Sequence, residues 1–219
     1  FEGDARLLHD AGCDMVFTGT LAQFFPGSDG VRERIPTRAA GRCALGLEGA
    51  HRPGHFDGVA TIVARLFELV RPARAYFGAK DFQQTLVVRD LARELGFPEV
   101  VVCPTSREAS GLARSSRNAL LSASERELAT TIFRALSAAR DAWWNDSVRS
   151  ASALAARMQA AFENSSLIVE YAEVRDPQVW TELAAPGKLE RAVALIAARA
   201  GSVRLIDNMR LDEAGARTS

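Results

Sequence analysis

Apolar side chains recur every third or fourth residue from position 55 to position 71, which is the spacing of one face of an amphipathic helix. Pro72 is expected to end this helix, because proline cannot continue its backbone hydrogen bonding. The same spacing predicts a second helix over residues 81–95. Asp81 is suited to be the N-cap of that helix, and Gly96 stands where a C-terminal glycine belongs.

Short apolar runs predict strands at residues 14–17, 75–77 and 100–103. The first run follows a short helix that ends at Gly12, and a weaker strand pattern lies within 37–50. Strands that alternate with helices are typical of a parallel sheet with crossover helices. Ligands bind at the carboxyl ends of such strands, which here are the loops that begin at Gly78 and Pro104.

The pattern changes after residue 104. Ser122 and Glu125 give the capping-box signal of a helix that runs to about Trp144, and a further helix is expected over 148–163. Three strands then follow at 167–174, 192–198 and 203–206. The fold class is therefore α/β, with a parallel-sheet domain over residues 1–105 and a small α+β domain over residues 106–219.

Composition narrows the classes of protein that this chain can be. It has 219 residues, and because Lys plus Arg and Asp plus Glu each number 27, its formal net charge is zero. A chain without net positive charge is a poor general nucleic-acid binder. No apolar stretch approaches the roughly eighteen residues of a membrane helix. Three widely spaced cysteines fit a reducing cytoplasm and give no metal motif, so we expect a cytoplasmic protein without a nucleic-acid, membrane or protein-held metal partner.

The first segment that could carry chemistry runs from Phe77 to Gln84 and reads Phe-Gly-Ala-Lys-Asp-Phe-Gln-Gln. Gly78 lets a ligand approach the backbone, and the helix N-terminus that follows favours a phosphate. Lys80 adds a mobile positive charge, and Gln84 lies one helical turn further on the same side. The local features fit a surface turn with an exposed lysine equally well.

The second segment runs from Arg107 to Asn118 and combines three arginines, three serines and a glycine. Hydroxyl groups beside guanidinium groups make a good phosphate clamp. A solvated linker is the alternative, and the position at the inferred domain boundary favours the clamp.

The third segment runs from Leu47 to Gly58 and contains His51, Arg52 and His55. Two histidines without a further evident ligand rarely hold a metal ion, so a metal site is disfavoured. His55 stands near a helix start, where it either contacts an anion or caps the helix.

These segments stand in the order and spacing of a known family. The motifs are Leu47-Glu-Gly with a following Arg-Pro-Gly-His-Phe-x-Gly, the run from Phe77 to Gln84, the run from Arg107 to Asn118, and Arg204-Leu-Ile-Asp-Asn-Met. Together they closely resemble the pantoate–β-alanine ligase family, the pantothenate synthetases. The resemblance runs from near residue 1 to about residue 209.

The resemblance implies a two-step reaction. ATP and pantoate form an enzyme-bound pantoyl adenylate and pyrophosphate with Mg²⁺, and the amine of β-alanine then displaces AMP to give pantothenate. Family members are usually homodimers with a Rossmann-like N-terminal domain and a smaller C-terminal lid, which agrees with a boundary near residue 105.

Carried over by position, the resemblance also implies the site residues. ATP would be bound by Gly78, Ala79, Lys80, Asp81, Ser106, Arg114, Ser115, Ser116 and Arg117. The catalytic set among them would be Lys80, Ser115, Ser116 and Arg117. Gln84 would orient pantoate, with Arg52 and His55 near its pocket. Attack of a carboxylate on a phosphate needs neutralised charge and fixed geometry more than a protein nucleophile, and this residue set can supply both.

Three positions depart from the family pattern. Ala79 stands where the family usually has Glu, Ser110 where it has Asp, and Arg114 where it has Met. The family's P-T-M-G-x-L-H-x-G-H segment, which binds ATP, is not in these 219 residues, so we expect an N-terminal third to be missing and the chain to have little ligase activity. Two alternatives are a related nucleotidyltransferase and a nucleotide-binding fragment that is weakly active or inactive.

Overall fold

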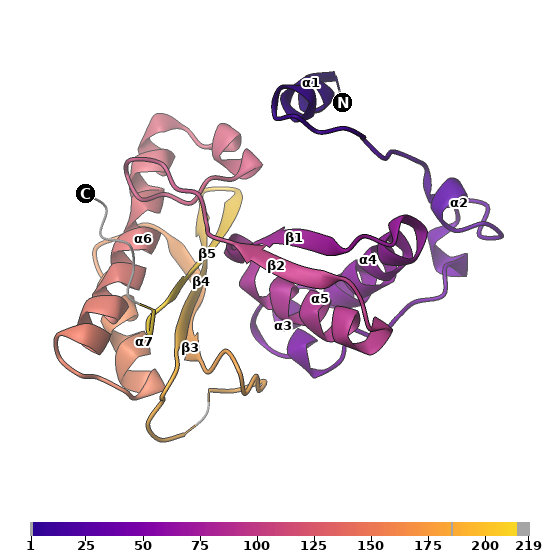
Figure 1. Cartoon of the computed structure of the whole chain (residues 1–219). Coiled ribbons are helices and arrows are strands. Elements are labelled where there is room, and N and C mark those ends of the chain that lie inside the picture. Colours follow the sequence, from indigo (N-terminus) through magenta and orange to yellow (C-terminus); the bar gives the residue numbers. More distant parts are fainter. Residues whose placement is uncertain (1, 185, 214–219) are drawn as a thin grey trace. The chain divides into compact units, whose positions relative to one another are not determined.

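The computed structural model describes residues 2–184 and 186–213 (Figure 1). The chain divides into two compact units, Phe1–Arg38 and Ala39–Ser219. The first unit contains α1 (Glu2–Asp10), α2 (Leu21–Phe24) and the 3₁₀ helix η1 (Arg32–Arg34). The strand predicted at 14–17 is wrong, because these residues are irregular. A short apolar run becomes a strand only where a neighbouring strand takes up its backbone hydrogen bonds, and none of the described strands pairs with it.

The strand pattern within 37–50 is also wrong. This segment forms the 3₁₀ helix η2 (Arg42–Ala44) and the short helix α3 (Leu47–His51). Gly41 and Gly46 precede them with positive φ angles of 71° and 70°, which residues with a side chain rarely adopt and which interrupt an extended strand. At Gly46 a Cβ atom would lie 2.5 Å from the carbonyl oxygen of Glu182, so only glycine fits this close approach.

The two helices predicted from apolar spacing are confirmed as α4 (His55–Val70) and α5 (Phe82–Leu95). Gly96 ends α5 in the left-handed conformation, as predicted. Asp81 occupies the N-cap position of α5, as predicted, but its side chain makes no capping hydrogen bond. The reason is local: the 3₁₀ turn η3 (Ala79–Asp81) leads directly into α5, so Asp81 belongs to the turn.

Strands β1 (Arg74–Gly78) and β2 (Glu99–Cys103) form a parallel pair in which Gly78 lies opposite Cys103. They confirm two of the three predicted parallel strands. Helices α4 and α5 cover one face of the pair (Figure 1). Phe67, Val88 and Leu91 of these helices form a cluster against which residues of both strands pack.

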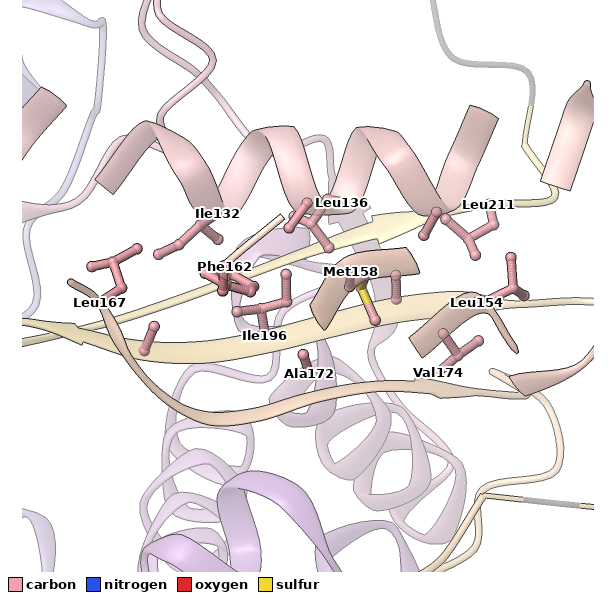
Figure 2. Packing of buried hydrophobic residues seen from close by; sticks show 14 of the residues in the cluster. Ile132, Leu136, Leu154, Met158, Phe162, Leu167, Ala172, Val174, Ile196 and Leu211 are labelled. Atoms are coloured by element: carbon pink, nitrogen blue, oxygen red, sulfur yellow. The ribbon is translucent and has the colours of Figure 1, made fainter. Parts of the chain in front are cut away.

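A three-stranded antiparallel sheet follows, in the order β3 (Ile168–Arg175), β4 (Val193–Ala200) and β5 (Val203–Arg210). Helices α6 (Ala123–Trp144) and α7 (Ala151–Ala160) cover one of its faces. The capping box of Ser122 and Glu125 at the start of α6 is confirmed. Figure 2 shows Ile132 and Leu136 of α6 above the sheet, facing Ile196 of β4.

The central strand β4 is buried on both faces. Its side chains alternate, as they must in a strand, between two hydrophobic clusters. Ala194, Ile196 and Ala198 pack beneath α6 and α7, whereas Val193, Leu195 and Ala197 join Phe82 and Leu86 of α5 and Leu47 of α3. Hydrophobic packing therefore joins the antiparallel sheet to α3 and α5 within the unit Ala39–Ser219.

The α/β fold class is confirmed, with a parallel sheet followed by a small antiparallel sheet domain. The predicted domain division at residue 105 falls inside the unit Ala39–Ser219 and stays a prediction. Within the described residues, no helix combines the length and the apolar character that crossing a membrane requires.

Cys43 is expected to resist alkylation in the native protein. It is buried, and its thiol donates a hydrogen bond to Asp90 Oδ2 at 3.0 Å. Burial, and then the hydrogen bond and charge of Asp90, raise the pKa of Cys43 to about 12, so almost no reactive thiolate forms at about pH 8. Iodoacetamide labelling followed by mass spectrometry should modify the exposed Cys13 first, and Cys43 only after denaturation. Equal native labelling of both would contradict the burial of Cys43.

Candidate active site

Lys80 lies in the turn η3 that follows β1 at the carboxyl edge of the parallel pair. Ligands of α/β proteins bind at this edge. The Lys80 side chain is only 20% exposed, and its Nζ atom lies 3.9 Å from the Asp81 carboxylate. Two pockets adjoin Lys80, which is among the lining residues of both.

The first pocket is cationic. Lys80, Arg117 and Arg204 outnumber its single carboxylate, that of Asp207. The rest of the lining is the polar pair Ser115 and Asn118 and the apolar residues Leu112, Ala113, Ile132, Leu205 and Ile206. Ser115 precedes the 3₁₀ helix η4 (Ser116–Leu120), and its hydroxyl accepts a hydrogen bond from the Arg117 N–H at 3.3 Å. Arg117 Nη1 donates to the carbonyl oxygen of Arg204 at 3.1 Å. Ammonium, guanidinium and hydroxyl groups that meet in this way suit the phosphate oxygens of a nucleotide.

The second pocket combines polar and apolar walls. Lys80, Asp81 and Gln84 line one part of it, with Glu48 and Asn208. Its apolar lining consists of Phe56, Phe82, Leu195 and Ile206. In a mainly apolar pocket, a few polar side chains fix the orientation of a small polar ligand by hydrogen bonding. Gln84 can donate and accept hydrogen bonds there, as expected for a group that orients a hydroxy acid.

The segment 107–118 is not a solvated linker. Leu112, Ala113 and Asn118 are buried in it. Arg107 at its start donates to both carboxylate oxygens of Asp207 on β5, at 2.6 and 3.0 Å. A bidentate guanidinium–carboxylate pair fixes orientation as well as distance. The loop that carries Ser115 and Arg117 is thus held to the antiparallel sheet.

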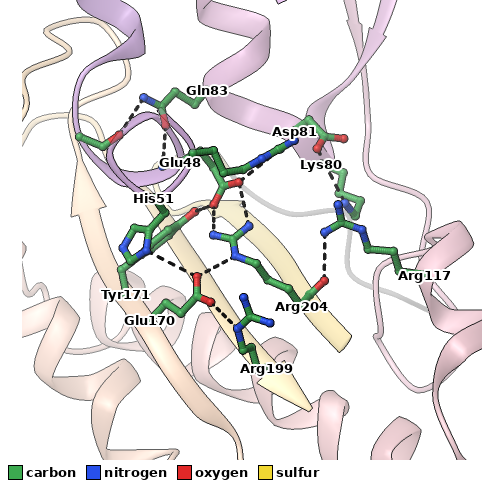
Figure 3. Close-up of polar contacts among 12 residues, drawn as sticks. Glu48, His51, Lys80, Asp81, Gln83, Arg117, Glu170, Tyr171, Arg199 and Arg204 are labelled. Atoms are coloured by element: carbon green, nitrogen blue, oxygen red, sulfur yellow. Dashed lines mark hydrogen bonds and ion pairs between the residues drawn. The ribbon is translucent and has the colours of Figure 1, made fainter. Parts of the chain in front are cut away.

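A buried network of charges centred on Glu48 joins α3 to this sheet (Figure 3). Glu48 accepts hydrogen bonds from Arg204 at 2.5 and 2.9 Å and from the Tyr171 hydroxyl at 2.8 Å. Arg204 also donates to Glu170 at 2.7 Å, and Glu170 in turn accepts a hydrogen bond from Arg199 at 2.8 Å. Arg204 therefore lies between two carboxylates at the rim of the cationic pocket.

The network sets the ionisation of its members. Burial alone would raise the pKa of Glu48, but the hydrogen bonds of Arg204 and Tyr171 and the neighbouring guanidinium charges outweigh it, so this pKa lies below its ordinary value. Hydrogen bonds to Glu48, and secondarily to Glu170, raise the pKa of Arg204. Burial, followed by the charge of Glu48, raises the pKa of Tyr171. Glu48 therefore remains ionised and Tyr171 neutral at pH 7.

Of the predicted site residues, Lys80, Asp81 and Gln84 meet at one pocket, and Lys80, Ser115 and Arg117 at the other. Seven other predicted site residues are not among the residues that line either pocket. They are Gly78, Ala79, Ser106, Arg114, Ser116, Arg52 and His55. Ser106 contributes its carbonyl oxygen, which accepts the Arg114 N–H at 2.9 Å.

The two groups expected near the pantoate pocket lie at the turn between α3 and α4. Arg52 is 3.9 Å from Glu48, and the His55 ring packs 5.0 Å from that of Phe56. Burial, followed by the charge of Arg52, lowers the pKa of His55, which keeps this histidine neutral at pH 7. The N-cap position of α4 is occupied by Gly54, which has no side chain to cap the helix, and His55 is the first helical residue. The roles of Arg52 and His55 in pantoate binding stay predictions.

The three departures from the family pattern differ in what they change. The carbonyl oxygen of Ala79 accepts a hydrogen bond from Asn208 at 2.9 Å, a contact that does not depend on the side chain at position 79. The Ser110 hydroxyl accepts the Leu112 N–H at 3.4 Å within the loop. Arg114 is exposed, and its Nε donates to the carbonyl oxygen of Arg107 at 3.3 Å.

Sequence reasoning gave no role to Glu48, Tyr171, Arg204, Asp207 or Asn208. All five are polar groups that the structure brings to the walls of the two pockets. For Arg204, Asp207 and Asn208 the sequence did contain a signal. Their charged or amide side chains interrupt the apolar strand pattern around Leu205 and Ile206. A buried strand tolerates such groups only when they find partners, so this interruption could have marked them.

Comparison with known proteins gives one consistent result. The sequence profile described as pantoate-beta-alanine ligase matches residues 1–210. A pantothenate synthetase of Rubrobacter xylanophilus is 46% identical over 215 residues, which are 96% of this chain and 73% of that protein. One of Cytophaga hutchinsonii is 40% identical over 209 residues, or 95% of this chain and 72% of that protein.

Solved structures agree. The crystal structure of a Thermus thermophilus pantothenate synthetase superposes with a TM-score of 0.84 at 40% identity, covering 96% of this chain and 74% of that one. A pantoate-beta-alanine ligase of Francisella tularensis, described as complexed with beta-gamma ATP and beta-alanine, gives a TM-score of 0.69 at 29% identity. The superposition covers 97% of this chain and 70% of the Francisella protein.

Proposed function

The chain belongs to the pantoate-beta-alanine ligase family, and from that premise we propose that it condenses pantoate with β-alanine in an ATP-dependent reaction through pantoyl adenylate. The observation that carries the proposal is the place of Lys80 between a cationic pocket and a mixed polar and apolar pocket. The first suits the phosphates of ATP. The second suits a small hydroxy acid, whose carboxylate would then face the α-phosphate across Lys80.

Two displacements make up the reaction. A pantoate carboxylate oxygen attacks the α-phosphorus of ATP, and the bond to the pyrophosphate oxygen breaks. The amine of β-alanine then attacks the acyl carbon, AMP leaves with the bonding electron pair, and the amine loses a proton. Lys80 and Arg117 would stabilise the negative charge that develops on the phosphate, so no protein nucleophile is required.

We assign the remaining roles by position. Ser115 and Ser116 would donate hydrogen bonds to phosphate oxygens beside Arg117, with Arg114 at the outer edge of the same loop. Gly78, Ala79, Asp81 and Ser106 would contact the nucleotide, and Gln84 would orient pantoate, with Arg52 and His55 at the turn before α4.

Mg²⁺ would enter as the MgATP complex. This ion is bound mainly by substrate phosphates, water and one or two carboxylates rather than by an all-protein cage. The Asp81 carboxylate, 51% exposed and beside Lys80, would be its protein contact. The ion would withdraw charge from the phosphates during the first displacement.

Three further expectations accompany the proposal. The family resemblance implies a homodimer, a cytoplasmic location and an N-terminal segment with ATP-binding histidines outside these 219 residues. This chain spans about 73% of the length of its Rubrobacter relative. The family match over residues 1–210 argues against a different nucleotidyltransferase. A nucleotide-binding chain with weak turnover remains the alternative.

Calorimetry and product assay together test the proposal. We expect the 219-residue chain to bind MgATP, and AMP to form only when both pantoate and β-alanine are present, at a slow rate. Replacing pantoate by other hydroxy acids, or β-alanine by other amines, should abolish AMP formation. MgATP binding without AMP formation would favour the weakly active alternative. Absence of any MgATP binding would contradict the proposed function.

A further inference from the structure

Asn208 on β5 makes an unusual pair of contacts with the turn that carries Lys80. Its side-chain amide nitrogen donates to the carbonyl oxygens of both Ala79 and Lys80, at 2.9 and 2.8 Å. Asn208 is only 7% exposed. An asparagine amide has two N–H donors, and here each one meets a separate carbonyl of the same turn. The backbone of η3 is thereby fixed from the antiparallel sheet.

The preceding residue fixes the second phosphate-binding segment in the same way. Asp207 is 5% exposed and takes the bidentate contact of Arg107 described above. Arg107 also donates to the carbonyl oxygen of Asn208 at 3.2 Å and to that of Gly111 at 3.0 Å. Adjacent residues of one strand therefore hold the turn of Lys80 and the loop of Arg117.

Burying a polar group is costly unless it is hydrogen-bonded, and a fully hydrogen-bonded buried network makes the segments that it joins more rigid. Lys80 has a long side chain with many rotamers, so the position of its ammonium depends on a fixed backbone. Reacting groups must be held to within a fraction of an ångström, and misplacement by about 1 Å can reduce a rate by about a hundredfold. A double hydrogen bond to the turn supplies that constraint.

We propose that Asn208 is a positioning residue that acts through Lys80, holding its turn so that the Lys80 ammonium and the Arg117 guanidinium meet the same phosphate group. The inference rests on the proposed function. Asn208 itself lines the mixed pocket but is assigned no bond to substrate. The Asp207–Arg107 pair holds the loop that carries Arg117, so both phosphate-binding segments are fixed to β5.

A double-mutant cycle on MgATP affinity tests the coupling. Asn208→Leu keeps the volume of the side chain and removes both donors, and Asn208→Ala is a second variant in case the first does not fold. We expect either variant to weaken MgATP binding by about tenfold in the wild-type background. In the Lys80→Ala background the same change should weaken binding by less than about twofold, because its effect passes through Lys80.

Asp212→Asn is the matched control. Asp212 pairs with Arg210 at the end of β5, at 2.7 and 3.0 Å, and lines neither pocket. It is expected to alter thermal stability without coupling to Lys80. Equal tenfold losses from Asn208→Leu in both backgrounds would overturn the inference and leave the proposed function intact. A wild-type chain that does not bind MgATP, or a Lys80→Ala variant that binds equally well, would overturn the site assignment itself.

Discussion

Replacing Arg204 with methionine is expected to lower the free energy of unfolding by about 3–5 kcal/mol, because it leaves a buried carboxylate without its main partner. Glu48 is 8% exposed at its side chain, and Arg204 is 13% exposed. Both short guanidinium contacts to the Glu48 carboxylate come from Arg204. Without Arg204, the carboxylate would keep only the hydrogen bond from the Tyr171 hydroxyl and the more distant charge of Arg52. Urea denaturation monitored by tryptophan fluorescence measures the change.

Two variants separate charge burial from simple loss of a contact. Arg199→Met removes a partner of Glu170 that is 44% exposed, so its effect should stay within about 1 kcal/mol. The double variant Glu48→Gln with Arg204→Met should be more stable than Arg204→Met alone, since no ionised group is then left buried at Glu48. An Arg204→Met effect as small as that of Arg199→Met would contradict the buried network.

The pH dependence of the free energy of unfolding gives a second check on Arg204→Met. The folded-state pKa of Glu48 lies below its unfolded value, so its contribution to stability is present above the unfolded pKa and is lost as the pH falls through the folded pKa. Without Arg204 that pKa rises, so the variant should be closest to the wild type in acid. The stability difference should widen between about pH 3 and pH 7.

Replacing Lys80 with alanine is expected to weaken MgATP binding by about tenfold to a hundredfold, which corresponds to a charge-assisted hydrogen bond in an enclosed site. Three of the described residues line both pockets, and of these Lys80 lies beside the parallel sheet whereas Ile206 and Asp207 belong to β5. The affinity of the wild type should fall as salt is added, and that of the variant should fall less. Isothermal titration calorimetry at two ionic strengths measures both effects.

Lys188→Ala is the matched control, because Lys188 is the only other lysine of the chain and is exposed. It should leave MgATP affinity unchanged. Lys80→Arg should restore part of the affinity but not all of it, because a planar guanidinium cannot take the place of a compact ammonium in an enclosed turn. Equal affinities of the wild type and Lys80→Ala would remove Lys80 from the site.

Local patterns were sufficient for the long helices α4, α5 and α6. The apolar spacing of α4 and α5, the capping box at Ser122 and the left-handed Gly96 each act within a few residues. The strand predicted at 14–17 failed for the opposite reason. A strand exists only with a partner, and a short apolar run carries no information about whether a partner is present.

The buried network could not be obtained from local patterns. Glu48 and Arg204 are 156 positions apart, and Arg107 and Asn208 are 101 apart. Glu48 stands in one of the motifs that carry the family resemblance, but no local pattern indicates that its partner is Arg204. By contrast, the glycine, serine and arginine residues around Lys80 and Arg117 drew attention to these two residues, and the family resemblance supplied their predicted role in ATP binding.

The double-faced burial of β4 bears on how this chain can change during evolution. Inserting or deleting one residue in β4 would turn every following side chain to the opposite face. Ile196 and its neighbours would leave the cluster beneath α6 at the same moment as Leu195 and its neighbours left the cluster beside α5. Both hydrophobic clusters would lose their packing at once. We therefore expect the length of β4 to be constant among related chains, whereas the lengths of the surface loops can vary.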